Sequence, residues 1–109
     1  MQLLTEELRA ALPALYGQEG NKNPTVYAKF FTPDSNWTWF ITEGGQEEDD
    51  YIFFCYVIGF EEEWGYSALS ELESVRGPLN LPIERDLNFK PGPFEEVLRR
   101  YRKERGEQA

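Results

Sequence analysis

The chain has 109 residues, a formal net charge of −9, and 28% charged and 16% aromatic residues. This length supports one domain with a single hydrophobic core, and the aromatic content argues against disorder. No apolar run approaches the ~20 residues of a membrane span, and the N-terminus MQLLTEEL lacks the pattern of a secretory signal. The only cysteine, Cys55, cannot form an internal disulfide. Together these features predict a cytoplasmic protein with no membrane contact.

The absence of histidine limits the chemistry open to this sequence. It removes the commonest general base, the Ser-His and Cys-His nucleophile pairs, and imidazole metal ligands. An enzyme built on this chain would depend on carboxylates, Tyr, Lys or Cys. Since no catalytic constellation is recognisable, the sequence favours a non-catalytic role, with no cofactor and no metal.

Periodicity in the first half of the chain predicts one helix and three strands. The helix covers Leu4–Leu15, where Thr5 suits the N-cap position, and a loop rich in Gly and Asn follows it. The strands show the alternation of a half-buried antiparallel sheet and cover Thr25–Thr32, Asn36–Glu43 and Tyr51–Phe60. In the first strand, Val26, Ala28 and Phe30 are expected to share a face. The third is apolar on both faces, which predicts that it is the central or the best-covered strand.

The connections and the second half of the chain carry weaker signals. We expect Gly44–Asp50 to be an acidic loop and Tyr66–Leu69 to be a fourth, edge strand. Ser70 and Glu73 match a capping box for a short helix over Glu71–Val75. Leu79–Pro91 is expected to be extended or looped.

The end of the chain predicts a second substantial helix. Pro93 suits its first position, basic residues suit its C-terminal end, and the tail from Gly106 is expected to fray. The predicted fold is therefore α+β, with one domain over residues 1–105 and a frayed tail over 106–109. A three- to four-stranded, mainly antiparallel meander would be flanked by the N- and C-terminal helices.

Several stretches resemble one family of proteins. They are LLTEELRAALPALY, KFFTPDSNWTWFITE, YVIG, GYSALSELESVRGPLNLPIERDL and an F-x-P that ends at Pro91, within a span from about Leu3 to about Leu98. In these stretches the chain is similar to the DUF2958 family of bacterial plasmids, integrative elements and phages. The resemblance implies a role in element maintenance, conjugation or countering host defence, and it implies no catalytic residue or cofactor.

Negative charge gathers between Glu43 and Glu63, a stretch with eight carboxylates and no Lys or Arg. Such a field repels phosphate backbones, so direct nucleic-acid binding is disfavoured and a protein partner or self-association is expected. The basic helix end, Arg99–Arg105, offers a weaker route to nucleic acid.

Two acidic segments are candidate partner-binding sites, and the second includes two aromatic residues. They are Glu47, Glu48, Asp49 and Asp50, and Glu61, Glu62, Glu63, Trp64 and Tyr66. Together they could present a DNA-like surface to a nucleic-acid-binding partner, provided that the carboxylates line one face. The alternatives are a solvated hairpin tip and a Trp64 ring that folds back onto the sheet. Consecutive acids point in different directions, which argues against an ion site.

A possible ligand face lies on the predicted sheet. Trp37 and Trp39 share one strand face and would be core under a covering helix, or an aromatic platform without one. The alternative function is therefore a small-ligand binder or an enzyme on the aromatic face.

That alternative requires polar groups to converge in a pocket on the sheet. It predicts that at least two of Tyr56, Glu43, Arg85 and Asp86 lie within hydrogen-bond reach of each other. An internal ion pair is the simpler role for Arg85 and Asp86, and Cys55 is expected to be an inert core residue.

Overall fold

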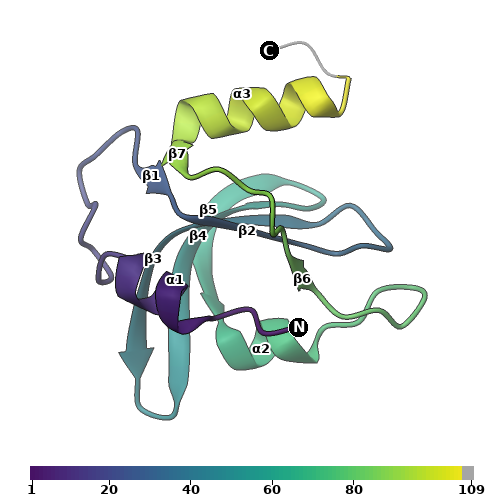
Figure 1. The fold of residues 1–109 in the computed structure, drawn as a ribbon, viewed down its shortest axis with the longest axis horizontal. Coiled ribbons are helices and arrows are strands. Elements are labelled where there is room, and N and C mark those ends of the chain that lie inside the picture. The colour runs from purple at the N-terminus through teal and green to yellow at the C-terminus, as the bar shows by residue number, and fades with distance from the viewer. Residues whose placement is uncertain (107–109) are drawn as a thin grey trace.

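Alternating apolar residues build an antiparallel meander at the centre of the fold, as the computed structural model of residues 1–106 shows (Figure 1). The main sheet has the strand order β5-β4-β3-β2-β6, and a second, two-stranded sheet pairs β1 with β7. The elements are α1 Glu6–Ala11, β1 Thr25–Val26, β2 Ala28–Phe31, β3 Thr38–Glu47, β4 Asp50–Ile58, β5 Glu62–Ala68, α2 Leu69–Ser74, β6 Glu84–Arg85, β7 Gly92–Pro93 and α3 Phe94–Glu104. The predicted α+β fold is confirmed, with five strands in the main sheet.

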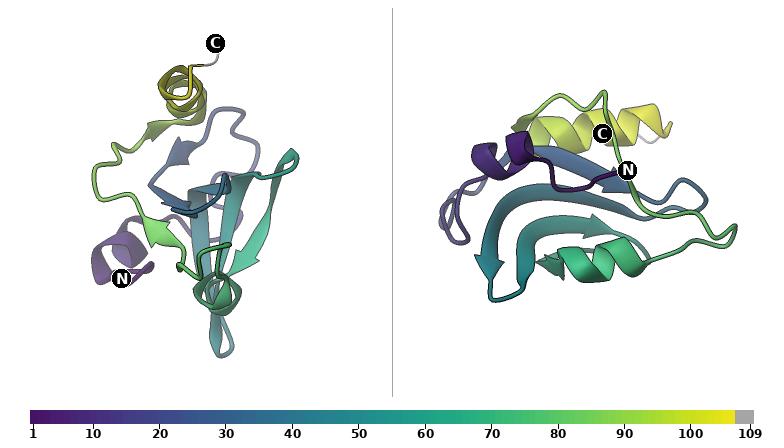
Figure 2. Two further views of the ribbon diagram at one scale, coloured as in Figure 1. Left: turned by 90° about the vertical axis from the view of Figure 1, so that its right-hand side faces the viewer. Right: turned by 60° about the horizontal axis from the view of Figure 1, so that its bottom comes forward.

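The three helices divide between the two faces of this sheet (Figure 2). Leu8 of α1 and Leu72 of α2 pack on one face, in a cluster that includes Phe30 and Phe53. Residues of α3 pack on the opposite face, in a cluster of Val26, Phe40, Ile58, Val97 and Tyr101. The interior strand β4, which lies beside the central strand β3, is therefore covered on both faces along part of its length, as its apolar pattern predicts.

The predicted acidic loop Gly44–Asp50 is wrong, because β3 continues through Glu47 and β4 begins at Asp50. The two glycines of this segment lie within β3, where they make room for neighbouring side chains. A Cβ atom on Gly44 would lie 2.5 Å from the Tyr51 ring, and one on Gly45 would lie 3.3 Å from Leu15. The turn itself contains only Glu48 and Asp49.

A β-bulge in β3 changes which face its later residues occupy. The register between β3 and β4 shifts between Ile41 and Glu43, so that Thr42 is the extra residue. Ile41 is paired with Cys55 on the α1/α2 face, whereas Glu43 is paired with Phe54 on the α3 face. Uninterrupted alternation would have placed Glu43 beside Ile41, so this bulge decides the environment of the carboxylate.

Breaks in the backbone pattern explain the other boundary differences. The predicted first strand is divided at Tyr27, which sends Val26 to the α3 face and leaves Ala28 and Phe30 on the opposite face. The first helix ends at Ala11, before Pro13, whose ring is incompatible with a helix interior.

The short helix α2 begins earlier than the capping-box pattern predicted. Its N-cap is Ala68, whose N–H donates to the Glu71 carboxylate, and Ser70 instead bonds Asp50. Most of Leu79–Pro91 is irregular, as predicted, apart from β6. The prediction of a frayed tail concerns residues 106–109, of which 107–109 lie outside the described residues. Within residues 1–106, no helix is long and apolar enough to cross a bilayer.

Candidate functional site

The edge strand β5 is the most accessible part of the main sheet. It pairs with β4 over seven residues without a register shift, and among residues 1–106 no strand pairs with its other side. Its last five residues, Trp64–Ala68, contain no charged residue and no proline. The opposite edge strand, β6, has only two residues, Glu84 and Arg85, and both are charged. Natural sheets protect their edges with short strands, charges, prolines or bulges, so β6 is protected and most of β5 is not.

A row of aromatic rings lies beside this edge, on the face that α3 covers only in part. Trp64 and Tyr66 are 38% and 54% exposed, and both contact Phe54 of β4, with ring centroids 5.5 and 4.9 Å apart. The row ends at Tyr16, 6.5 Å from Tyr66, and at Phe94 of α3, 4.8 Å from Trp64. Exposed aromatic surface of this extent is typical of an interaction site.

The row and the loop of residues 16–24 enclose a cleft of about 500 Å³. Phe54, Trp64 and Tyr66 contribute its aromatic lining, and Thr42 and Glu43 also line it. Together with the edge of β5, this cleft is the candidate functional site.

A buried polar network holds the loop of residues 16–24 against the sheet. The Glu43 carboxylate, on a residue only 4% exposed, accepts the N–H groups of Tyr16 and Gln18 at 2.7 and 2.9 Å. The Gln18 amide donates to the carbonyl oxygens of Thr25 and Thr42 and accepts the Thr25 N–H. These bonds satisfy groups that would otherwise be unpaired near the core, and they fix the wall of the cleft.

The carboxylates around the cleft make its electrostatic environment acidic. The pKa of Tyr66 is raised above its ordinary value, first by the neighbouring Tyr16 phenol, then by desolvation and by the carboxylates of Glu43 and Glu19. Tyr66 is therefore a neutral hydrogen-bond donor at neutral pH.

A second polar cluster connects α3 to the start of β5. The Glu62 carboxylate accepts two hydrogen bonds from Arg102, at 2.6 and 3.1 Å, and one from the Tyr56 hydroxyl at 2.7 Å. Arg102, then Tyr56, hold the pKa of Glu62 below its ordinary value, whereas desolvation, then Glu62, raise the pKa of Tyr56 to about 12. Glu62 and Tyr56 therefore have a structural role: through Arg102 they attach α3 to the sheet.

The predicted acidic segments do not form one surface. Glu47, Glu48, Asp49 and Asp50 lie at one end of β4, and Glu61, Glu62 and Glu63 lie at its other end, about 27 Å away by strand length. Glu43 is buried, Glu62 is bonded to Arg102, and Asp50 is bonded to Ser70, which lowers the pKa of Asp50. The condition for a DNA-like surface, carboxylates along one face, is not met.

The predicted ligand face is mostly core. Trp39 is buried in the α1/α2 cluster, and the partly buried Trp37 stacks on it with ring centroids 6.0 Å apart. Both line a cleft of about 430 Å³ beside Val75, Arg76 and other residues that follow α2. Trp39 is therefore a core residue, whereas Trp37 is only partly covered and faces the cleft.

The polar groups of the predicted pocket are each bonded elsewhere. Tyr56 donates to Glu62, Glu43 accepts from the loop of residues 16–24, and Arg85 donates to the Gln2 carbonyl oxygen at 3.4 Å. Asp86 accepts the Asn88 N–H at 2.9 Å and forms an ion pair with the Lys29 ammonium at 3.8 Å. The convergence that the enzyme hypothesis required does not occur.

Cys55, which the sequence predicts to be inert, is a core residue. It is buried, its Sγ contacts the Gly65 carbonyl oxygen and the Ser67 hydroxyl, and desolvation raises its pKa to about 11. Among residues 1–106, no three His, Cys, Asp or Glu side chains are grouped in a way that could hold a metal.

Sequence reasoning identified Trp64 and Tyr66 but missed the rest of the aromatic row. Phe54 could have been predicted as a member of this row, because strand alternation places it on the same face as Tyr56. Tyr16 gave no signal, since it lies in an irregular loop that the fold carries to the sheet.

These features define a class of α+β protein with one protected and one open sheet edge, the open one beside an aromatic cleft. A family model described as "Protein of unknown function (DUF2958)" matches residues 3–104, and the chain belongs to this family. The match extends past Leu98, so it includes most of the basic helix end that the sequence resemblance left out. Neither the curated proteins nor the solved structures contain a match to the chain.

Proposed function

We propose that this protein is a binding module that receives an extended segment of a partner protein along the edge of β5. The single observation that carries the proposal is the unprotected edge Trp64–Ala68 beside exposed aromatic rings. Alternate residues of such an edge point their N–H and C=O groups outward, and an added strand can bond these groups. The Ala68 N–H is an exception, because it already donates to the Glu71 carboxylate. The proposal places the protein in the cytoplasm, with its partner encoded by, or targeted by, a mobile genetic element.

The aromatic row supports this proposal by supplying side-chain contacts. Trp64 and Tyr66 occupy one face of β5, so alternate side chains of an added strand would lie beside them. Aromatic residues supply most of the binding energy at many interfaces, and truncating one such anchor typically costs 2 kcal/mol or more, roughly 30-fold in affinity.

Charge supports a basic partner segment. Glu61 and Glu63 are exposed before β5 and at its start, and Glu71 and Glu73 are exposed on α2 directly after it. The chain as a whole carries a net charge of −9. A segment with Lys or Arg at its ends and apolar residues between them would complement both the charges and the rings.

The proposal can be tested by selecting random peptides on the full chain and mapping where they bind. We expect the selected peptides to alternate apolar and other residues, to carry Lys or Arg, and to protect the amides of Glu62–Ala68 from hydrogen exchange. Gly65→Lys should abolish binding, because an added charge protects a strand edge. Gly65→Ala is the matched control, since no atom lies within 4 Å of a Cβ atom at this position.

Two further measurements decide the nature of the occupant. A photo-crosslinking residue at Tyr66, introduced in cells that encode the chain, should link to an extended basic segment of another protein. If the chain forms a dimer and Gly65→Lys dissociates it, the occupant of the β5 edge is a second copy of the chain and not another protein. Peptides that bind Gly65→Lys and Gly65→Ala equally would refute binding at the β5 edge.

A further inference from the structure

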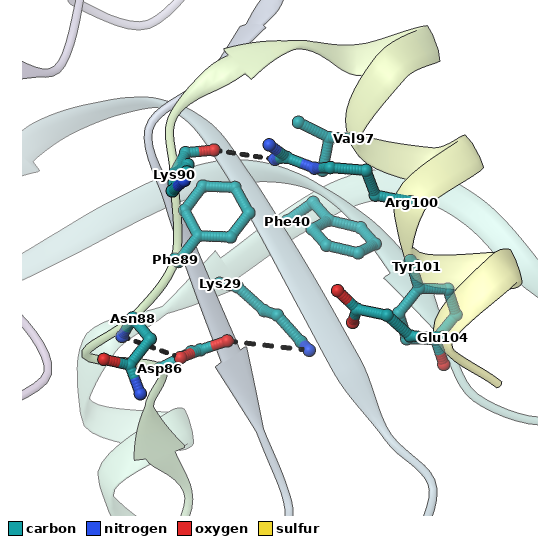
Figure 3. A pocket seen from close by; sticks show the side chains of 10 residues that line it. All are labelled: Lys29, Phe40, Asp86, Asn88, Phe89, Lys90, Val97, Arg100, Tyr101 and Glu104. Atoms are coloured by element: carbon teal, nitrogen blue, oxygen red, sulfur yellow. Dashed lines mark hydrogen bonds and ion pairs between the residues drawn. The ribbon is translucent and has the colours of Figure 1, made fainter.

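A separate pocket of about 290 Å³ lies beneath α3, away from the β5 edge. Its walls are α3 and the segment of residues 86–90, and its floor is formed by β2 and β3 (Figure 3). The apolar lining consists of Phe40, Phe89, Val97 and Tyr101. The Phe40 ring lies 5.4 Å from Tyr101 and 6.4 Å from Phe89, so three aromatic rings form one contacting cluster in the pocket lining.

One charged group in this pocket with unused hydrogen-bonding capacity is the Lys29 ammonium. The Lys29 side chain is only 19% exposed, and its Nζ lies 3.8 Å from Asp86 Oδ2, beyond hydrogen-bond distance. The other contact of Nζ with the pocket is with the Tyr101 ring, 5.5 Å away. An ammonium has three donors, and in a partly desolvated position they favour an anionic acceptor.

The charged residues that line the pocket are three bases and two acids, so they carry a small net positive charge, in contrast to the chain as a whole. Lys90 and Arg100 also line the pocket, opposite Asp86 and Glu104, in a chain whose net charge is −9. Arg100 is fixed by a hydrogen bond to the Lys90 carbonyl oxygen at 2.7 Å and lies over the Phe89 ring. The pocket is thus a locally cationic site with a flat aromatic lining.

We infer that this pocket binds a small aromatic ligand that carries one anionic group. The ring would pack among Phe40, Phe89 and Tyr101, and the anionic group would accept hydrogen bonds from Lys29. The volume is adequate, since a cavity of roughly 150 Å³ can hold benzene. Carboxylate and phosphate share this chemistry, and the two are separated by the choice of probe. This inference does not depend on the proposed function at the β5 edge.

The test is titration of the full chain with four probes, followed by amide NMR shifts and calorimetry. Benzoate and phenyl phosphate provide a ring and an anion, benzamide provides a ring alone, and acetate provides an anion alone. We expect benzoate or phenyl phosphate to shift the amides of Lys29, Phe40 and Phe89, and to bind at least about tenfold more tightly than benzamide or acetate. The stronger of the two anionic probes identifies the anionic group.

Variants distinguish a built site from general charge attraction. Lys29→Met keeps the aliphatic part of the side chain and should remove the preference for the anionic probes, whereas Lys22→Met, in the exposed loop, should leave it unchanged. If Lys29→Met does not fold, Phe89→Leu should weaken binding of the aromatic probes and leave any acetate binding unchanged. The inference is overturned if none of the probes shifts these amides, if benzamide binds as tightly as the stronger of benzoate and phenyl phosphate, or if the two lysine variants behave alike.

Discussion

The buried Glu43 carboxylate provides the sharpest test of how the candidate site is held together. Glu43→Ala would remove the acceptor for the Tyr16 and Gln18 N–H groups, at 2.7 and 2.9 Å, in an environment that is 4% exposed. Hydrogen bonds to a charged group contribute about 1.5–3 kcal/mol each. Two such bonds give a loss of about 3–6 kcal/mol in the free energy of unfolding, reduced to about 2 kcal/mol if water reaches the freed N–H groups.

Urea unfolding, followed by both circular dichroism and tryptophan fluorescence, measures this loss directly. Hydrogen exchange at Tyr16 and Gln18 should accelerate in the variant, because both amides lose their acceptor. Glu19→Ala is the matched control, since Glu19 is an exposed carboxylate in the same loop, and a change within about 0.5 kcal/mol is expected. A loss below about 1 kcal/mol for Glu43→Ala would show that the network does not fix the cleft wall.

Three further predictions follow from the packing and the polar contacts. The buried Cys55 thiol, with its pKa raised to about 11, should react with a thiol reagent only as fast as the chain unfolds, and rapid reaction of the folded protein would contradict its burial. The lowered pKa of Glu62 stabilises the fold at pH values above the ordinary glutamate pKa of about 4.3. Glu62→Gln should therefore lower the free energy of unfolding by about 0.5–1 kcal/mol at neutral pH. This loss of stability should disappear as the pH falls through the lowered pKa of Glu62. A difference in urea unfolding that does not change with pH would refute the prediction. Gly59→Ala would place a Cβ atom 2.4 Å from the Trp37 ring and should lower the free energy of unfolding by about 1–3 kcal/mol. The near-ultraviolet circular dichroism should also change, whereas Gly65→Ala should be nearly neutral.

The fold class could be predicted from the sequence because its signals are local. The alternation in Tyr51–Phe60 follows from the geometry of a strand, and the apolar stripe of the last helix follows from the period of 3.6 residues. Trp64 and Tyr66 could be proposed as interaction residues because aromatic residues beside acidic ones are a local pattern as well. The resemblance to DUF2958 was likewise carried by contiguous stretches of sequence.

Only the tertiary structure decided where these residues meet. The bulge at Thr42 turns Glu43 to the face of the cleft, because one extra residue reverses a period of two. The strands β6 and β7 have two residues each and exist only through pairing with distant strands. Tyr16 reaches Tyr66 across 50 positions of sequence, and Lys29 reaches Asp86 across 57. Composition and periodicity therefore determined the longer helices and strands and most of the core, whereas non-local packing determined the two-residue strands, the open edge, the aromatic cleft and the pocket beneath α3.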